Sequence, residues 1–191
     1  MKLNDVSQAR PGYLSRSKIE PNEKGSHFLL QIRDFDKERR TIDASGLFRF
    51  FAKPVKDESL LQDGDVIFLA KGARNFAAAV QGLPYPCLAA SYFFVLRPLP
   101  KLLPAYLAWQ LNQEPARQHF AKFGTSGAHM PVVRREVLEN LEIPLPNIEQ
   151  QRKIVAIDQL ARQQTRLLAQ LADKKLKLAA AICQQAARAN P

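Results

Sequence analysis

The segment Leu145-Pro146-Asn147-Ile148-Glu149-Gln150-Gln151-Arg152-Lys153-Ile154 decides how the chain is organised. Pro146 ends the strand-like segment before it, and the side-chain oxygen of Asn147 can cap a helix. Gln150 stands at the third helical position, where a capping box places Glu or Gln. From there to residue 190 the sequence has no Pro or Gly, and good helix formers dominate. The sequence therefore predicts one helix from Ile148 to about Arg188, on the order of 60 Å long.

Apolar residues recur along this predicted helix with the alternating three- and four-residue spacing of a coiled coil. Leu160, Leu167 and Ala181 widen the apolar stripe. Because the preceding domain is too small to cover a stripe of this length, we expect a second helix to pack on it. The alternative is that the helix folds back over its own sheet. The predicted helix-pairing residues are Ile154, Ile157, Ala161, Leu168, Leu171, Leu178 and Ile182, with Gln164, Lys175 and Gln185 at polar positions of the same seam.

Residues 1–147 differ in character, with short apolar, aromatic and β-branched runs separated by Gly, Pro and Asp. Helical spacing appears at 104–123, where Pro115 should interrupt the helix, and at 134–140. Asp63-Gly64-Asp65 is typical of a turn that opens a strand. The sequence thus predicts an α/β (α+β) domain over residues 1–147, then a long coiled-coil-forming helix over 148–191. The predicted strands are 27–35, 41–51, 65–70, 77–80 and 87–96, with a strand-like segment at 141–146.

The composition indicates a folded protein with a basic surface. An apolar fraction of 46% with 11 Phe is enough for a core, and 28 Lys plus Arg against 18 Asp plus Glu give a net charge of +10. This balance favours a polyphosphate partner such as DNA. Cys87 and Cys183 lie far apart and suggest neither a disulfide framework nor a metal site. Without a secretion signal or a long apolar run, we expect a cytoplasmic protein.

No motif in the sequence signals catalysis. The glycine patterns of dinucleotide and nucleoside triphosphate sites are absent, and the histidines lack the spacing of a zinc site. Pro86-Cys87 is an isolated match to a methyltransferase motif, and Cys87 is expected to be a buried strand residue. Asp63, Asp65 and Lys71 lack the further acidic partner of a metal nuclease. We therefore expect no enzymatic activity, cofactor or metal, with a magnesium-dependent nuclease as the alternative.

Three loops rich in hydrogen-bond donors are candidate DNA contacts. In the loop at 71–75, Arg suits guanine and Asn suits adenine, and both also suit phosphate. The cations of the predicted hairpin turn alternate with acidic residues and equally fit a solvated turn. The third loop, rich in Gly, fits either a phosphate contact or an ordinary loop. The candidate residues are Arg33, Lys37, Arg39 and Arg40 in the hairpin, Lys71, Arg74 and Asn75 in the second loop, and Lys122, Thr125, Ser126 and His129 in the third.

Several segments, taken together, resemble the specificity subunit of type I restriction-modification systems. The resemblance covers essentially the whole chain and corresponds to one repeat of a recognition domain plus a helix. Its most specific piece is the segment that leads into the long helix. The segments are Leu61-Gln62-Asp63-Gly64-Asp65-Val66-Ile67-Phe68 with Lys71-Gly72, Leu103-Pro104-Ala105-Tyr106-Leu107-Ala108-Trp109-Gln110-Leu111, and Leu141-Glu142-Ile143-Pro144-Leu145-Pro146 with Glu149-Gln150-Gln151-Arg152-Lys153-Ile154-Val155.

The resemblance implies a non-catalytic target-recognition domain that reads about half of a split DNA site in a phage-defence system. It also implies a helix that pairs antiparallel with a second such helix. Modification subunits with S-adenosylmethionine chemistry would dock on these helices, and a restriction subunit can join them. The usual specificity subunit carries two recognition domains and two helices, whereas this chain carries one of each.

A half-length chain can restore the full architecture as a homodimer that reads a bipartite palindrome. It can also be a fragment, or a standalone DNA-binding relative in another defence assembly. A different class of function remains open on the sequence, that of a protein-interaction adaptor whose basic helix binds acidic partners.

Overall fold

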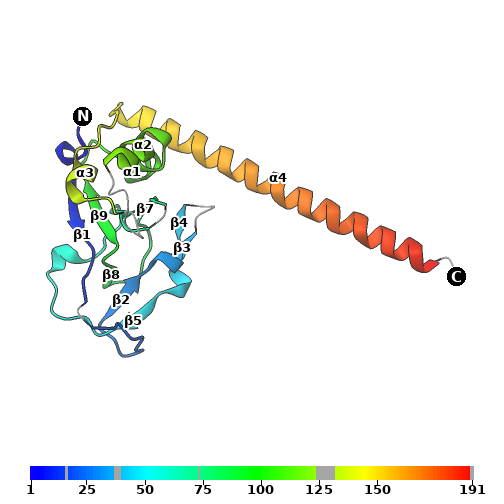
Figure 1. Ribbon diagram of the computed structural model, residues 1–191, viewed down its shortest axis with the longest axis horizontal. Helices are drawn as coiled ribbons and strands as arrows, with labels where there is room; N and C mark the ends of the chain where they lie inside the picture. The colour runs from blue at the N-terminus through cyan, green and yellow to red at the C-terminus, as the bar shows by residue number, and fades with distance from the viewer. Residues whose placement is uncertain (16, 37–39, 73, 124–131, 190–191) are drawn as a thin grey trace. The chain divides into compact units, whose positions relative to one another are not determined.

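The structure, a computed structural model, describes all residues except 16, 37–39, 73, 124–131 and 190–191 (Figure 1). The strands form a four-stranded sheet in the order β1-β9-β6-β7, a three-stranded sheet β5-β2-β8 and a hairpin β3-β4. This mixture of sheet and helix, with its long C-terminal helix, confirms the predicted fold class. The strands are β1 Ser7–Pro11, β2 His27–Leu30, β3 Phe35–Asp36, β4 Thr41–Ile42, β5 Phe48–Phe50, β6 Val66–Leu69, β7 Ala77–Ala79, β8 Cys87–Ala89 and β9 Phe93–Pro98. The helices are α1 Pro104–Leu111, α2 Glu114–Phe123, α3 Arg135–Glu139 and α4 Ile148–Ala189.

Strand β6 lies at the centre of the core. It pairs antiparallel with β7 on one side and β9 on the other, and all four of its residues are buried. Successive side chains of a strand point to opposite faces, so the two faces of β6 pack on different neighbours. Phe68 packs against Phe120 of α2 with ring centroids 5.0 Å apart. Ile67 and Leu69 belong to the apolar cluster that includes residues of the three-stranded sheet.

Some runs predicted as single strands are interrupted, and this part of the prediction is wrong. The run at 27–35 breaks at a 3-10 turn, Ile32–Asp34, because the buried Asp34 carboxylate accepts the N–H of Gln31 at 2.7 Å. Such local hydrogen bonds between side chain and backbone compete with strand pairing. Burial also raises the pKa of the Asp34 carboxyl. The runs at 41–51 and 87–96 divide likewise into β4 and β5, and into β8 and β9. The strand-like segment at 141–146 forms a single bridge, Lys2 to Glu142.

The predicted break near Pro115 is confirmed, and a buried amide marks it. Asn112 follows α1 and is 5% exposed. Its Nδ2 donates to the carbonyl oxygens of Ala77 and Ala108 at 2.8 and 2.7 Å, and its Oδ1 accepts the Ala77 N–H at 3.1 Å. The Asn112 side chain therefore acts as an extra pairing partner at the edge of β7 and fixes α1 to the sheet.

The turn at Asp63-Gly64-Asp65 is confirmed, with Gly64 at a φ of 93°. The Asp65 carboxylate, whose ion pairing no sequence pattern predicted, is 1% exposed and lies between two guanidinium groups. Arg10 Nη2 lies 3.0 Å from it and Arg97 Nε 2.8 Å. The hydrogen bond to Asp65 raises the pKa of Arg97, whereas burial lowers that of Arg10. This ion-paired cluster ties β1 and β9 to the start of β6.

Helix α4 begins where the sequence predicts, at Ile148. The Asn147 Oδ1 accepts the N–H of Gln150 at 2.9 Å, which confirms Asn147 as the cap. Met1–Arg152 form one compact unit and Lys153–Pro191 another, so the first turn of α4 packs with the residues before it. Within the described residues, no helix is long and apolar enough to cross a membrane.

The side chain of Gln151 anchors that first turn. It is 0% exposed, and all of its hydrogen-bonding groups have partners in the same compact unit. Its Oε1 accepts the N–H of Leu103 at 2.8 Å. Its Nε2 donates to the carbonyl oxygens of Lys101 at 2.9 Å and Pro146 at 2.8 Å. One amide thus joins the start of α4 to the segment that opens α1.

We predict that Gln151→Ala lowers the free energy of unfolding by about 2–4 kcal/mol, because it leaves buried backbone groups without partners. Urea denaturation followed by circular dichroism would measure this change. The matched control is Gln150→Ala, an exposed neighbour in the same turn, for which we expect a change below about 0.5 kcal/mol. Equal effects of the two substitutions would show that the amide does not anchor the helix.

Candidate nucleic-acid interface

Two of the three predicted DNA-contact loops meet through an aromatic stack. Phe35, the first residue of the β3-β4 hairpin, stacks on Phe76 with ring centroids 3.7 Å apart and ring planes 11° apart. Phe76 directly follows the loop that carries Lys71, Arg74 and Asn75. The hairpin that carries Arg40 and this loop are therefore fixed to each other at their bases.

The third loop ends against the second. Val132, the first described residue after the loop, forms an antiparallel bridge with Lys71. The N–H of Val133 donates to the carbonyl oxygen of Ala70 at 2.8 Å. All three predicted loops therefore start or end at one edge of the domain, beside the ends of β6 and β7. Lys37, Arg39, Thr125, Ser126 and His129 lie outside the described residues.

The second loop carries two exposed cations and one amide with a structural role. Lys71 and Arg74 are exposed, and Gly72 has a φ of 153°, a conformation that favours glycine. Asn75 is half-buried, and its Nδ2 donates to the carbonyl oxygen of Leu69 at 2.8 Å. The amide of Asn75 thus closes the loop back onto the end of β6, while the two cations face solvent.

Near the other two loops, Arg33 and Lys122 each lie over an aromatic ring. The Arg33 guanidinium lies 5.2 Å from the centroid of the Phe48 ring and 3.8 Å from the Asp34 carboxylate. Lys122 Nζ lies 5.5 Å from the Phe123 ring. Arg40 is half-buried with a φ of 54° at the end of the hairpin turn. The ring contacts of Arg33 and Lys122 limit the conformational freedom of two exposed cationic side chains.

The aromatic anchors Phe35 and Phe76 were not among the predicted site residues. Nothing in the sequence pairs them, because the contact joins segments some 40 positions apart. Arg49 lies over the Phe28 ring at 5.1 Å and resembles Arg33 in this respect. It is on the opposite face of β5 from Phe48, since successive strand residues alternate. Arg49 therefore belongs to a different surface from Arg33.

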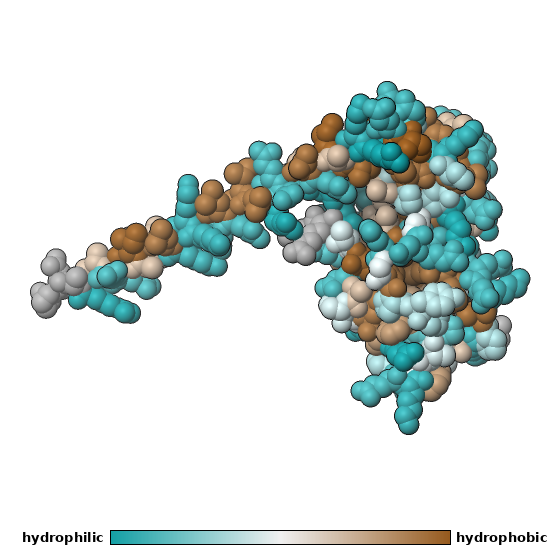
Figure 2. Space-filling model, turned by 180° about the vertical axis from the view of Figure 1, so that it is seen from behind, coloured by the Kyte–Doolittle hydropathy of each residue, from teal (hydrophilic) through white to brown (hydrophobic). Residues whose placement is uncertain are grey.

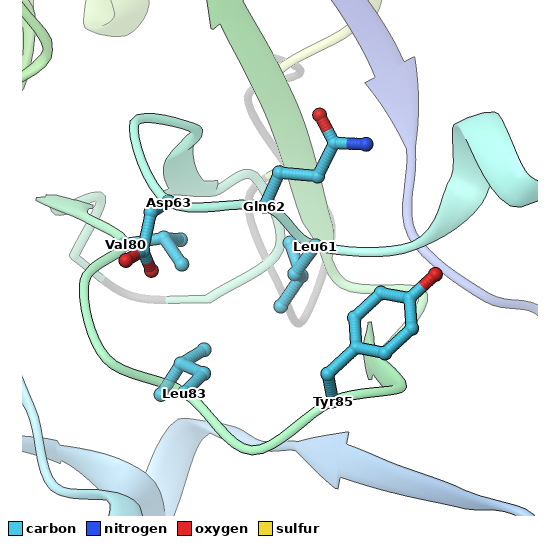
Figure 3. Close-up of a pocket in the computed structure, with 6 residues that line it drawn as sticks. All are labelled: Leu61, Gln62, Asp63, Val80, Leu83 and Tyr85. Carbon is cyan, nitrogen blue, oxygen red and sulfur yellow. The ribbon is translucent and has the colours of Figure 1, made fainter.

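A shallow pocket of about 300 Å³ lies near the start of β6, and its chemistry differs from that of the three loops (Figure 3). Leu61, Val80 and Leu83 point into it, and the Tyr85 ring stands at one side. Its charged group is the carboxylate of Asp63, which accepts the N–H of Gly82 at 2.8 Å. An apolar pocket with a carboxylate does not suit a phosphate.

The described residues include potential metal ligands and two free cysteines, Cys87 and Cys183. Among those residues, no three or more His, Cys, Asp or Glu side chains are grouped so that they could hold a metal ion. Cys87 is buried in β8, as predicted, and burial raises the pKa of its thiol to about 12. The thiolate, which is the reactive form, is therefore scarce at neutral pH.

Helix α4 presents an apolar stripe. Figure 2 shows brown apolar side chains recurring along the helix between teal hydrophilic ones. Ion pairs Asp158–Arg162 and Asp173–Lys177, at 2.6 and 2.7 Å, support the helix. Leu160, Leu167, Leu168 and Leu171 line a groove together with Gln163 and Gln164. Of the predicted helix-pairing residues, Ile157, Leu168, Leu171, Leu178 and Ile182 are 49–67% exposed, Ala161 is exposed and Ile154 is half-buried.

Comparison with known proteins relates the chain to restriction-modification systems. Residues 1–174 match the sequence model of the type I restriction modification DNA specificity domain. A chain from a structure on complex assembly and conformational transition of the type I R-M system aligns with a TM-score of 0.65 and 22% identity, covering 93% of this chain and 42% of that one. Curated protein sequences give no match.

Two further solved structures share the fold. The HsdS subunit from Thermoanaerobacter tengcongensis aligns with a TM-score of 0.58 and 23% identity, covering 88% of this chain and 38% of that one. The type I restriction-modification S subunit from M. genitalium aligns with a TM-score of 0.53 and 14% identity, covering 93% and 42%. This chain thus spans about two fifths of the length of the structures it matches.

We predict that Asn75→Ala lowers the free energy of unfolding by about 1 kcal/mol, because it removes the bond to Leu69. If Asn75 acts by holding the loop, the same substitution weakens binding to all DNA duplexes by a similar factor. Thermal denaturation and fluorescence anisotropy with duplexes of different sequence would measure both effects. Unchanged stability with an altered preference at one base pair would instead identify Asn75 as a base-reading residue.

Proposed function

This chain belongs to the type I restriction modification DNA specificity domain family, and we propose that it reads one part of a split DNA site for a partner methyltransferase. The observation that carries this proposal is that the described ends of three donor-rich loops meet at one edge of the domain, through the Phe35–Phe76 stack and the Lys71–Val132 bridge. In such an arrangement loops from distant parts of the chain can follow one stretch of duplex together. The net charge of +10 favours the same partner.

Within this site we assign different tasks to the two exposed cations of the second loop. The planar guanidinium of Arg74 suits two hydrogen bonds to guanine, whereas the compact ammonium of Lys71 suits a phosphate. The remaining proposed contacts position the duplex or adjust to its shape. They are Arg33, Lys37, Arg39, Arg40, Asn75, Lys122, Thr125, Ser126 and His129.

The chain itself catalyses no reaction in this proposal. S-adenosylmethionine and the methyl transfer belong to the modification subunit, and a restriction subunit can join the complex. Helix α4 serves assembly, with a second copy of this chain on its apolar stripe and the modification subunits docked on the pair. A homodimer would bring two recognition domains together, and this chain spans about two fifths of the length of its structural relatives.

The deciding experiment is selection from a randomised duplex library at moderate salt, with the purified chain alone and with its modification subunit. We expect enrichment of a palindrome split by a spacer, because a two-fold axis relates the two recognition domains. If no sequence is enriched and affinity only fades as salt rises, the chain is a general basic adaptor and the proposal fails.

We predict that Lys71→Ala weakens binding to all sequences and lowers the slope of log affinity against log salt by about one. Arg74→Ala is expected to cost about 1–3 kcal/mol with the selected site and to relax preference at one base pair. Anisotropy titrations over a salt series would measure both. The control is Lys18→Ala, which removes the same charge from an exposed side chain outside the three loops. If Lys18→Ala and Lys71→Ala changed the affinity and the salt slope equally, the assignment of Lys71 to a phosphate contact would be wrong.

We predict that replacing Leu168 and Leu171 together by Asp abolishes self-association, because charges would enter an apolar interface. The thermal unfolding of the recognition domain should stay unchanged, since both residues lie in the Lys153–Pro191 unit. Light scattering would give the particle mass. A mass equal to that of the unsubstituted dimer would place the interface elsewhere.

A further inference from the structure

The seam of α4 is symmetric about its own midpoint. Its ten positions alternate three and four residues apart from Ile154 to Gln185, and this order reads the same in both directions. The midpoint falls between residues 169 and 170, with Leu168 and Leu171 on either side of it. A helix with such a seam can pair with an identical, antiparallel helix so that every layer has a partner, as a two-fold interface requires.

The identities of the residues match across this midpoint as well. Each seam residue would face the partner residue equally far from the midpoint, so Leu168 meets Leu171 and Ile157 meets Ile182. The small Ala161 meets the larger Leu178, which lets the layer fill evenly. Only the outermost layer, Ile154 with Gln185, joins an apolar residue to a polar one. Leu160, beside the seam, would lie near the partner's Ala181.

The two polar residues inside the seam meet each other. Gln164 and Lys175 are both exposed in the single chain and lie equally far from the midpoint. The Gln164 amide oxygen can accept a hydrogen bond from the partner's Lys175 ammonium, whose aliphatic stem lies along neighbouring leucines. The symmetry repeats this contact, so each dimer contains two such layers.

Other registers or orientations of the helix pair would place these polar residues against unsuitable partners. An antiparallel pairing displaced by one heptad places Lys175 against Leu171 or Ile157, and Gln164 against Ile182 or Leu168. A parallel pairing places Lys175 on Lys175 of the partner, which brings like charges together within the seam. A buried polar position is known to select register in coiled coils for this reason.

We propose that the antiparallel α4 pair, which the resemblance already implies, has one register, centred between residues 169 and 170 and set by Gln164 facing Lys175 of the other copy. The inference rests on the proposed function only in taking a second copy as the occupant of the apolar stripe. It adds which residues face each other and which of them select the register.

The test is Gln164→Glu, measured by sedimentation equilibrium of the full chain. In the proposed register it creates two ion pairs with Lys175, and we expect the dimer Kd to fall about fivefold at low salt. The gain should shrink in 1 M salt because exposed charges are screened. In a parallel pair two Glu side chains would face each other, and in a displaced register Glu would face an apolar residue, so the Kd would rise.

The control is Gln163→Glu, which adds the same charge one residue away from the seam, and its Kd should stay within about twofold of the unsubstituted chain. Gln164→Lys should weaken the dimer, and Gln164→Lys combined with Lys175→Glu should restore it. In a Cys183→Ser background, a chain with Leu168→Cys should form a disulfide with a chain carrying Leu171→Cys more readily than with one carrying Lys175→Cys. Circular dichroism would verify helix content for each variant.

The outcomes separate this inference from the proposed function. If Gln164→Glu weakens a dimer that still selects a split palindrome, the register is wrong and the function stands. If the unsubstituted chain stays monomeric up to its solubility limit, both the register and the homodimer are wrong. Enrichment of a single half-site would then still support DNA reading by the recognition domain.

Discussion

The buried amide of Gln151 is the contact on which the arrangement of this protein depends. A fully buried amide is costly unless all of its polar groups are bonded, and Gln151 meets this requirement with the backbone of Lys101, Leu103 and Pro146. These partners belong to the segment that opens α1 and to the segment that precedes α4. The first turn of α4 therefore belongs to the same compact unit as the residues before it.

In the candidate DNA-binding surface, different residues fix the loops and face solvent. Its fixed parts are apolar or backbone contacts at the bases of loops, where Phe35 stacks on Phe76 and Val132 bridges Lys71. Its cations, Lys71 and Arg74, are exposed and contribute little to the core. Because both side chains are exposed, exchanging them is expected to have small effects on folding. A specificity protein benefits from this separation, since a new DNA target requires new contacts on the same scaffold.

The sequence predicted what depends on local physics. The cap at Asn147, the break near Pro115 and the extent of α4 follow from neighbouring residues, and the structure confirms them. The predicted strand bounds were wrong where a polar side chain accepts a hydrogen bond from the backbone, as Asp34 does from the N–H of Gln31. The candidate loops were found from their composition, but their meeting at one edge was not, because the Phe35–Phe76 contact joins distant segments. The roles of Asn112 and Asp65 were missed for the same reason, since both bind groups far away in the sequence.

The polar seam residues of α4, Gln164 and Lys175, select the register of the proposed helix pair. A seam of leucines and isoleucines alone would bury more apolar surface, yet it could pair in several registers of similar free energy. Gln164 and Lys175 reduce the attainable stability and, in return, make the displaced registers costly, because each would leave polar groups against apolar ones. In the proposed homodimer, a slip of one heptad would shift each copy by about 10 Å along the other. That shift equals about three base-pair steps of duplex, so under the proposed function a change of register is expected to change the length of the spacer that the dimer accepts.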